Sequence, residues 1–354
     1  MKKEGGGLII TLAVCILGLY ASFLTWSVLQ ERISTKPYGS NPDTGSPDFF
    51  KAPLVINIIQ AFFASIVGLI YSLVSSRSNP LSIFTQNEKP VALKFFKSFV
   101  IISLTSSLSS PLGYESLKHV DYLAYLLAKS CKLIPVMLVH FVLYRTKFPL
   151  YKCMVAGSVT VGVIIFTLSH SSTKSKADIS DGKTALGMAQ LIGSMLLDGL
   201  TNSTQDQLFK LRGTSPSNKH TKLTGAYLMC ILNAFIFINT LTYALIFKYQ
   251  SEITYTVNFV HHYPQVMINI LEFAILGSVG QVFVFIILEK FDSLILITST
   301  VTRKMISMIL SVVLFGHQLN ALQWGGVGLV FGGIGYEALV KMSMNRTPTT
   351  KKNQ

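Results

Sequence analysis

Ten apolar stretches run through this chain of 354 residues and limit what it can fold into. A helix of about 20 apolar residues is long enough to cross a bilayer, where only helices and closed barrels satisfy every backbone hydrogen bond. Charged residues make up 13% of the chain, compared with about 25% in soluble proteins. We therefore predict an all-α membrane protein with ten transmembrane helices, at 8–29, 53–74, 97–114, 121–143, 151–169, 186–208, 223–247, 266–288, 294–315 and 320–340.

Lysine and arginine are distributed unevenly between the segments that join these helices. If both termini are cytoplasmic, the cytoplasmic segments carry more than twice as many basic residues as the opposite loops, as the positive-inside rule expects. The net charge of +14 then comes from these segments and from basic residues within the spans, and it requires no nucleic-acid partner. We predict a multi-pass protein of the lipid bilayer with both termini in the cytoplasm.

Two of the predicted spans share a short sequence pattern. The segment 132–138, KLIPVML, resembles the segment 304–310, KMISMIL, and each lies in the fourth of five spans. Because five is odd, the second half would enter the membrane in the opposite orientation, and such inverted repeats are typical of secondary transporters. The predicted units are a first repeat with a lumenal loop, a second repeat and a cytoplasmic tail, at 1–170 (loop 30–52), 171–340 and 341–354.

Four basic residues lie near the middle of these two spans. Lys129 and Lys132 are three residues apart and would share one helix face, and Arg303 and Lys304 are adjacent. Each cation at the centre of a membrane helix costs roughly 2.5–3.5 kcal/mol. Phosphate suits such a cluster, because arginine offers a bidentate fork and lysine a point charge. We predict that these four residues bind an anion.

Acidic residues within the membrane offer an alternative explanation. Asp198 lies in the sixth span and Glu272 in the eighth, so two of the four cations could be paired structurally. A surplus of about two positive charges would still remain near the midplane. Glu31, at the end of the first span, is a candidate gate, because an acid at the mouth of a cavity can pair with a lysine when no substrate is bound.

Three further side chains are candidates for contacts with a base or a sugar. Gln281 could read a base or a sugar hydroxyl, or it could bond to a neighbouring helix. Tyr114 and Tyr125 flank the fourth span and could stack on a base, or they could anchor the chain at the membrane interface. The four cysteines occur singly and no nucleophile–base set is present, so we predict no metal, no cofactor and no enzymatic activity.

The C-terminus ends in the sequence KKNQ. Lys351 and Lys352 stand at the third and fourth positions from the end, where a dilysine signal retrieves proteins to the endoplasmic reticulum through the coat machinery. A lysine-rich tail is also found simply as a positively charged flank. We favour the retrieval signal, and with it the membrane of the endoplasmic reticulum.

Several motifs recur in the order found in a known family. They are Ser110-Pro-Leu-Gly-Tyr114, Lys129-Ser-Cys-Lys-Leu-Ile-Pro-Val-Met137, Gly280-Gln-Val-Phe-Val-Phe285, Thr302-Arg-Lys304 and Gln323-Trp-Gly325. The pattern resembles the nucleotide-sugar transporters of the drug/metabolite transporter superfamily, of the solute carrier 35 type. It is most similar to their endoplasmic-reticulum branch, the UDP-galactose transporter homologues of subfamily B.

This resemblance implies an antiporter that works by alternating access. It would exchange a nucleotide sugar of the UDP-galactose or UDP-glucose class for a nucleotide, with the four cations on the phosphates and Glu31 as the gate. The alternative is an ATP/ADP exchanger that supplies the lumen of the endoplasmic reticulum. A membrane enzyme with a phosphate-bearing donor and a non-transporting scaffold are the remaining alternatives. The absence of a base or metal set argues against the enzyme, and the scaffold would leave the four cations without a purpose.

Overall fold

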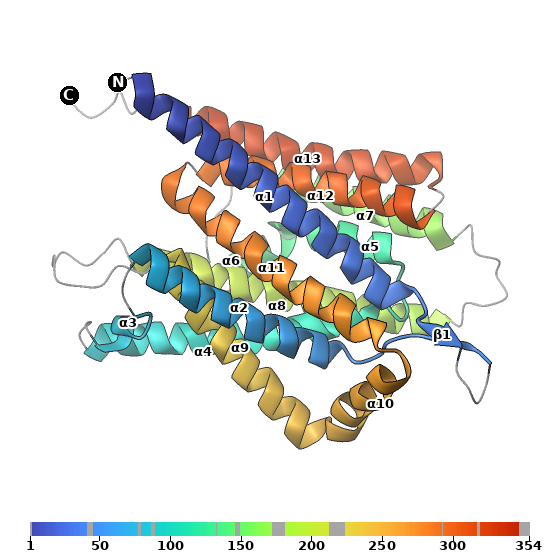
Figure 1. The fold of residues 1–354 in the computed structure, drawn as a ribbon. Helices are drawn as coiled ribbons and strands as arrows, with labels where there is room; N and C mark the ends of the chain where they lie inside the picture. Colours follow the sequence, from blue (N-terminus) through green and yellow to red (C-terminus); the bar gives the residue numbers. More distant parts are fainter. Residues whose placement is uncertain are drawn as a thin grey trace.

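The computed structural model is a bundle of long helices (Figure 1). It describes residues 2–40, 45–76, 79–85, 89–131, 133–145, 149–171, 181–211, 224–291, 293–316 and 319–346. The elements of the first half are α1 (Lys2–Thr35), β1 (Gly39–Ser40), β2 (Pro47–Asp48), α2 (Pro53–Ser76), α3 (Ser82–Thr85), α4 (Lys89–Ser116), α5 (Tyr122–Ser130), α6 (Leu133–Tyr144) and α7 (Leu150–Ser171). Those of the second half are α8 (Asp181–Leu211), α9 (Gly225–Phe247), η1 (Tyr249–Thr254), α10 (Tyr255–His262), α11 (Gln265–Lys290), α12 (Ser293–Phe315) and α13 (Ala321–Arg346).

The length and composition of the helices indicate a protein that crosses a membrane several times. Within the described residues, six helices are long and apolar enough to span a bilayer, namely α1, α2, α4, α9, α11 and α12. A shorter apolar helical segment, Leu150–Phe166, lies in α7. The prediction of a multi-pass helical protein is confirmed at this level. Each of the ten predicted segments contains helix, but α8 has a carboxylate in its middle and the fourth segment is broken.

The fourth predicted segment is two helices and not one. α5 ends at Ser130 and α6 begins at Leu133, and the amide of Cys131 donates to the carbonyl of Ala128 at 2.9 Å, as at the end of a helix. Pro135 explains the break, because its ring has no N–H and crowds the carbonyl four residues earlier, that of Cys131. The prediction of one continuous helix over 121–143 was therefore wrong.

One end of the bundle carries additional structure, and we call it the hairpin end. α1 extends into the predicted loop 30–52 as far as Thr35, and β1 and β2 then pair antiparallel. Between α9 and α11, where no helix was predicted, the chain forms η1 and α10 (Figure 1). α1 begins and α13 ends at the opposite end of the bundle.

A buried carboxylate ties η1 to the beginning of α2. Glu252 is 8% exposed, and it accepts a hydrogen bond from the backbone amide of Leu54 at 3.1 Å. This amide belongs to the first turn of α2, where no carbonyl of the same helix can accept it. Burial raises the pKa of Glu252 from its usual 4.5 to about 7. The link between α9 and α11 is thereby fixed to α2 by a group that titrates near neutral pH.

The most extensive helix contacts join the first half of the chain to the second. α7 packs on α13, α4 on α8, α2 on α9, and α1 on α11. When the two halves are exchanged, α1 takes the place of α8, α2 of α9, α4 of α11, α5 and α6 of α12, and α7 of α13, and each of these contacts then becomes itself or another of them. The smaller contacts form pairs in the same way, namely α2–α11 with α4–α9, α6–α8 with α1–α12, and α5–α7 with α12–α13. The two halves thus have matching neighbours throughout the bundle.

Two glycines hold α7 and α13 close together. A Cβ added to Gly162 would lie 2.7 Å from the carbonyl oxygen of Gly326, and one added to Gly326 would lie 2.6 Å from the carbonyl oxygen of Gly162. No real Cβ tolerates such distances. Small residues of this kind let helix backbones approach in a membrane, where packing replaces the hydrophobic effect as the driving force.

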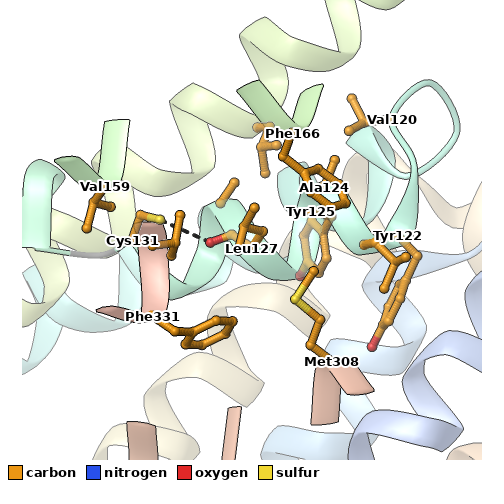
Figure 2. Packing of buried hydrophobic residues seen from close by; sticks show 14 of the residues in the cluster. Val120, Tyr122, Ala124, Tyr125, Leu127, Cys131, Val159, Phe166, Met308 and Phe331 are labelled. Carbon is orange, nitrogen blue, oxygen red and sulfur yellow. Dashed lines mark hydrogen bonds between the residues drawn. The ribbon is translucent and has the colours of Figure 1, made fainter. Parts of the chain in front are cut away.

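The helix α5 is embedded in the largest apolar core. Figure 2 shows its side chains interleaved with those of α7, α12 and α13, among them Tyr125, Leu127, Val159, Phe166, Met308 and Phe331. The thiol of Cys131 donates to the carbonyl of Leu127 at 3.1 Å. This packing fixes the short helix in place, and with it the lysine in its last turn.

Candidate functional site

A cavity of about 300 Å³ lies inside the bundle, next to the break between α5 and α6. It is lined by α1, α2, α4, α5, α8 and α12, through Trp26, Ser27, Gln30, Gln60, Ser110, Tyr114, Tyr125, Leu126, Lys129, Ser130, Asp198, Arg303, Lys304 and Ser307. Both halves of the chain contribute cations to it. The described charged groups in its wall are Lys129, Arg303, Lys304 and Asp198, so basic groups exceed acidic ones.

The first cation is held by a network of polar side chains. Lys129 Nζ lies 2.6 Å from Asp198 Oδ2 and 2.7 Å from Ser194 Oγ, and 3.5 Å from Ser109 Oγ. Ser109 also donates to the other oxygen of Asp198. The lysine stands in the last turn of α5, where the partial negative charge of a helix C-terminus favours a cation. Its charge is therefore compensated inside the protein.

A close backbone contact places the carboxylate of this pair. A Cβ added to Gly199, the residue after Asp198, would lie 2.7 Å from the carbonyl carbon of Pro135. Glycine thus lets α8 lie directly against the first turn of α6. The same proline that interrupts the helix therefore sits against the segment that carries the acid, and this brings Asp198 to Lys129.

The other two cations come from α12 and contact different groups. The guanidinium of Arg303 lies over the ring of Phe23, 4.6 Å from its centroid, which is a cation–π contact. Lys304 Nζ donates to the carbonyl oxygen of Lys129 at 3.3 Å. This bond joins α12 to the last turn of α5, so the cations of the two halves meet at one wall.

A layer of tyrosines around one glutamine closes the cavity toward the hairpin end. Tyr122 donates to the carbonyl of Ser27 at 3.0 Å and lies 3.4 Å from the amide oxygen of Gln30. Gln30 is also hydrogen-bonded to the hydroxyls of Tyr114 and Tyr125. Tyr114 lines the central cavity and also a second one, of about 510 Å³, under the hairpin. The layer of Gln30 and the three tyrosines therefore lies between the two cavities.

The structure places five of the predicted binding residues together. Lys129, Arg303, Lys304, Tyr114 and Tyr125 all line the central cavity. Lys132, Lys351 and Lys352 lie outside the described residues.

The remaining predicted residues have other positions. Gln281 is on α11 and is not among the side chains that line the cavity. Glu31 is 1% exposed and follows Gln30 of the closing layer, close enough to Tyr122 to act on it electrostatically. The expected pairing of Asp198 with a cation is present, whereas Glu272 is exposed on α11 and away from the cavity.

Sequence reasoning missed the polar residues that complete the wall. Ser109 and Ser194 position the lysine, Gln30 organises the tyrosines, and Gln60 and Trp26 line the cavity. The available signal was the serine-rich character of the third span and the acid in the sixth, since unpaired polar groups inside a membrane are costly. Among the described residues, no group of three His, Cys, Asp or Glu side chains is arranged to hold a metal ion.

Comparison with known proteins identifies the family. The sequence matches the UAA transporter family over residues 11–341, almost the whole chain. The chain belongs to this family of nucleotide-sugar transporters. The resemblance noted from its motifs is thereby confirmed.

Named relatives of this UAA transporter cover all or nearly all of its length. The UDP-galactose transporter homolog 1 of Debaryomyces hansenii is 98% identical over 100% of both chains. The protein of the same name from Candida albicans is 59% identical over 94% of this chain and 90% of its own, and that from Saccharomyces cerevisiae is 40% identical over 95% and 96%. Because these relatives are named as transporters, the prediction of a protein that is not an enzyme is confirmed.

A solved structure shares the fold. A crystal structure of a protein that is 12% identical covers 92% of this chain and 99% of its own, with a TM-score of 0.55. At this identity the likeness concerns the arrangement of the helices alone. It shows that a bundle with this arrangement of helices has also been found by experiment.

Proposed function

We propose that this transporter exchanges a nucleotide sugar of the UDP-galactose or UDP-glucose class for a nucleotide across the membrane of the endoplasmic reticulum, by alternating access. The names of its relatives supply the substrate class. The observation that carries the proposal is the cavity, in which cations from both halves of the chain face a space inside the bundle.

The charges in the wall suit a nucleotide sugar. Three cations and one carboxylate among the described lining residues leave a surplus of two positive charges. The diphosphate of a nucleotide sugar carries one negative charge on each phosphorus, so the bound complex would be close to neutral. Arginine and lysine are the side chains that recognise phosphate, by a fork and by a point charge respectively. In this proposal Lys132, from the same motif, joins them.

The remaining lining residues suit the uncharged parts of this substrate. Tyr114, Tyr125 and Trp26 offer aromatic faces for a base, and Gln60 and Gln30 offer amides for its edge or for sugar hydroxyls. The cavity of about 300 Å³ is at the lower end of the range for small-molecule sites, roughly 300–1,000 Å³. Gln281 would contribute only through a rearrangement of α11.

Alternating access is supported by the relation between the two halves. The matching helix contacts favour two five-helix repeats, 1–170 and 171–340, in inverted orientation, with α5 and α6 together as the fourth membrane-spanning segment. The layer of Gln30 and the three tyrosines lies between the cavity and the hairpin end, where a transporter needs a gate. Glu31, buried beside this layer, would take part in the gate.

The location is proposed from the ends of the chain. In this proposal Lys351 and Lys352 form the retrieval signal in the tail 341–354, read by the coat machinery, and the excess of basic residues supports a cytoplasmic position of both termini. The hairpin end would then face the lumen. Replacing both lysines by serine, followed by microscopy of the tagged protein, tests the signal, because the variant should leave the endoplasmic reticulum for later compartments. Unchanged retention would exclude the signal as the cause.

The decisive experiment uses the purified protein in liposomes preloaded with UMP, with ADP or with buffer. Uptake of labelled UDP-galactose or UDP-glucose that requires internal UMP supports the proposal. Uptake of labelled ATP that requires internal ADP, without uptake of UDP sugars, would replace it by an energy carrier for the lumen. Equal uptake into empty liposomes would contradict exchange, and no uptake of any nucleotide would favour a non-transporting scaffold.

A further inference from the structure

The carboxylate of Asp198 lines the cavity, in addition to holding Lys129 in place. It lines the same space as Arg303 and Lys304, and its side chain is 34% exposed there. Its partner Lys129 lines this space too, with a side chain that is 19% exposed. A ligand that fills the cavity therefore meets the negative charge together with the positive ones.

The position of this negative charge is fixed. One carboxylate oxygen is bound by Lys129 and the other by Ser109, while Ser194 holds the lysine from the other side. Gly199 places this turn of α8 directly against Pro135. Because these contacts come from α4, α5, α6 and α8, four helices hold the carboxylate at the wall of the cavity.

We infer that Asp198 is a charge filter that sets how many negative charges the transported nucleotide carries. This inference rests on the proposed function and names a determinant of its specificity. With Asp198 ionised, the wall carries one negative charge among its cations, and this charge repels a ligand in proportion to the number of negative charges on the ligand. Charges that share one cavity wall interact appreciably even where they are partly exposed to solvent. Compared with the same cavity without this carboxylate, the site thus favours nucleotide sugars and nucleoside monophosphates over nucleoside di- and triphosphates.

Two isosteric substitutions change this charge in opposite directions. Asp198→Asn removes one negative charge with little change of shape. Gln60→Glu adds one at a half-buried position of α2 in the wall of the same cavity. The double variant has the charge of the wild type, so it should recover the preference of the wild type. Glu272→Gln is the matched control, because it removes an exposed carboxylate that does not line the cavity.

The test keeps the base constant and varies the number of phosphates. Exchange of labelled UDP-galactose in liposomes is measured against competing UMP and UDP, which differ by about one charge at neutral pH. The expected ratio of their inhibition constants shifts toward UDP in Asp198→Asn and toward UMP in Gln60→Glu, by roughly tenfold each for charges a few ångströms apart. Asp198→Glu, which keeps the charge, and Glu272→Gln should leave the ratio unchanged.

A second readout separates this inference from the proposed function. Stabilisation of the solubilised wild type and variants against heat by UMP or UDP reports binding without transport. If the wild type binds but exchanges nothing, the proposed function fails while the binding ratios still test the filter. If Asp198→Asn alone fails to fold, the double variant Asp198→Asn/Gln60→Glu is compared with Gln60→Glu, and its ratio should be shifted toward UDP. Unchanged UMP-to-UDP ratios in the folded variants would overturn the filter and leave Asp198 a purely structural partner of Lys129.

Discussion

The two sides of the cavity hold their cations differently. On the α5 side, Lys129 is bound by a carboxylate and two hydroxyls, whereas on the α12 side Arg303 lies over an aromatic ring and Lys304 donates to a backbone carbonyl. A carboxylate compensates the charge of a lysine, whereas an aromatic ring and a backbone carbonyl carry no net charge. We therefore propose that the α12 side binds phosphate and that the α5 side sets the charge of the site.

Removal of a cation from the α12 side should have the largest effect. We expect Lys304→Ala to lower UDP-sugar exchange about 100-fold or more, since truncating one partner of a buried charge contact costs roughly 2–5 kcal/mol. The protein should still elute as a folded species in size-exclusion chromatography. Lys97→Ala, which removes an exposed lysine of α4, is the control and should exchange normally. Normal exchange by Lys304→Ala would remove the α12 side from the phosphate site.

On the α5 side, Lys129 and Asp198 should affect the exchange rate through the net charge of the pair. Lys129→Ala leaves Asp198 without its cation, and the resulting negative charge should slow exchange by roughly thirtyfold. Lys129→Ala/Asp198→Asn restores the charge of the wall, and we expect it to exchange about tenfold faster than the single variant. Initial rates in preloaded liposomes measure both. If the second substitution gave no recovery, the loss would come from the contact of Lys129 with the phosphates and not from the charge of the wall, and the contrast between the two sides would be lost.

The aromatic contact of Arg303 should make a smaller contribution. Phe23→Leu removes the ring under the guanidinium, and a contact of this kind is worth about 0.5–2 kcal/mol. We expect the KM for the UDP sugar to rise severalfold with little change in the maximal rate. Phe62→Leu, at an exposed phenylalanine of α2, serves as the control. An equal rise in both variants would mean that general packing, and not the orientation of Arg303, is responsible.

The smallest effect should come from a carboxylate outside the cavity. The pKa of Glu252 rises from 4.5 to about 7 on burial, so the folded protein holds this proton more tightly than the unfolded chain does. The stability that results is complete below pH 4.5 and is lost as the pH rises through about 7. We expect Tm to fall by a few degrees as the pH rises over this range. In Glu252→Gln, the part of this fall that is due to Glu252 should be absent. An unchanged profile in the variant would assign the pH dependence to other groups.

The meeting of the cations could be predicted from the sequence. Two predicted spans share a pattern and central basic residues, and three of these residues, Lys129, Arg303 and Lys304, line one cavity. They meet because a charge inside a membrane has few places to go other than the interior of the bundle, while anion binding by the cluster stays a prediction.

The rest of the wall depends on packing that periodicity does not reveal. α4 and α8 contain polar and apolar residues on several faces, so their sequences do not show that Ser109 would meet Ser194 and Asp198. The break at Cys131 had a local signal in Pro135, but the predicted span 121–143 continues on both sides of it. η1 and α10 were missed because a short amphipathic segment between spans resembles an ordinary loop.

The pairing of α7 with α13 through Gly162 and Gly326 also has a consequence for biosynthesis. The ribosome makes Gly326 164 residues after Gly162, which takes roughly 10–30 s at 5–20 residues per second. During this time α7 lacks α13, the helix on which it packs most extensively. The helix α7 therefore reaches its final packing only after α13 has been made.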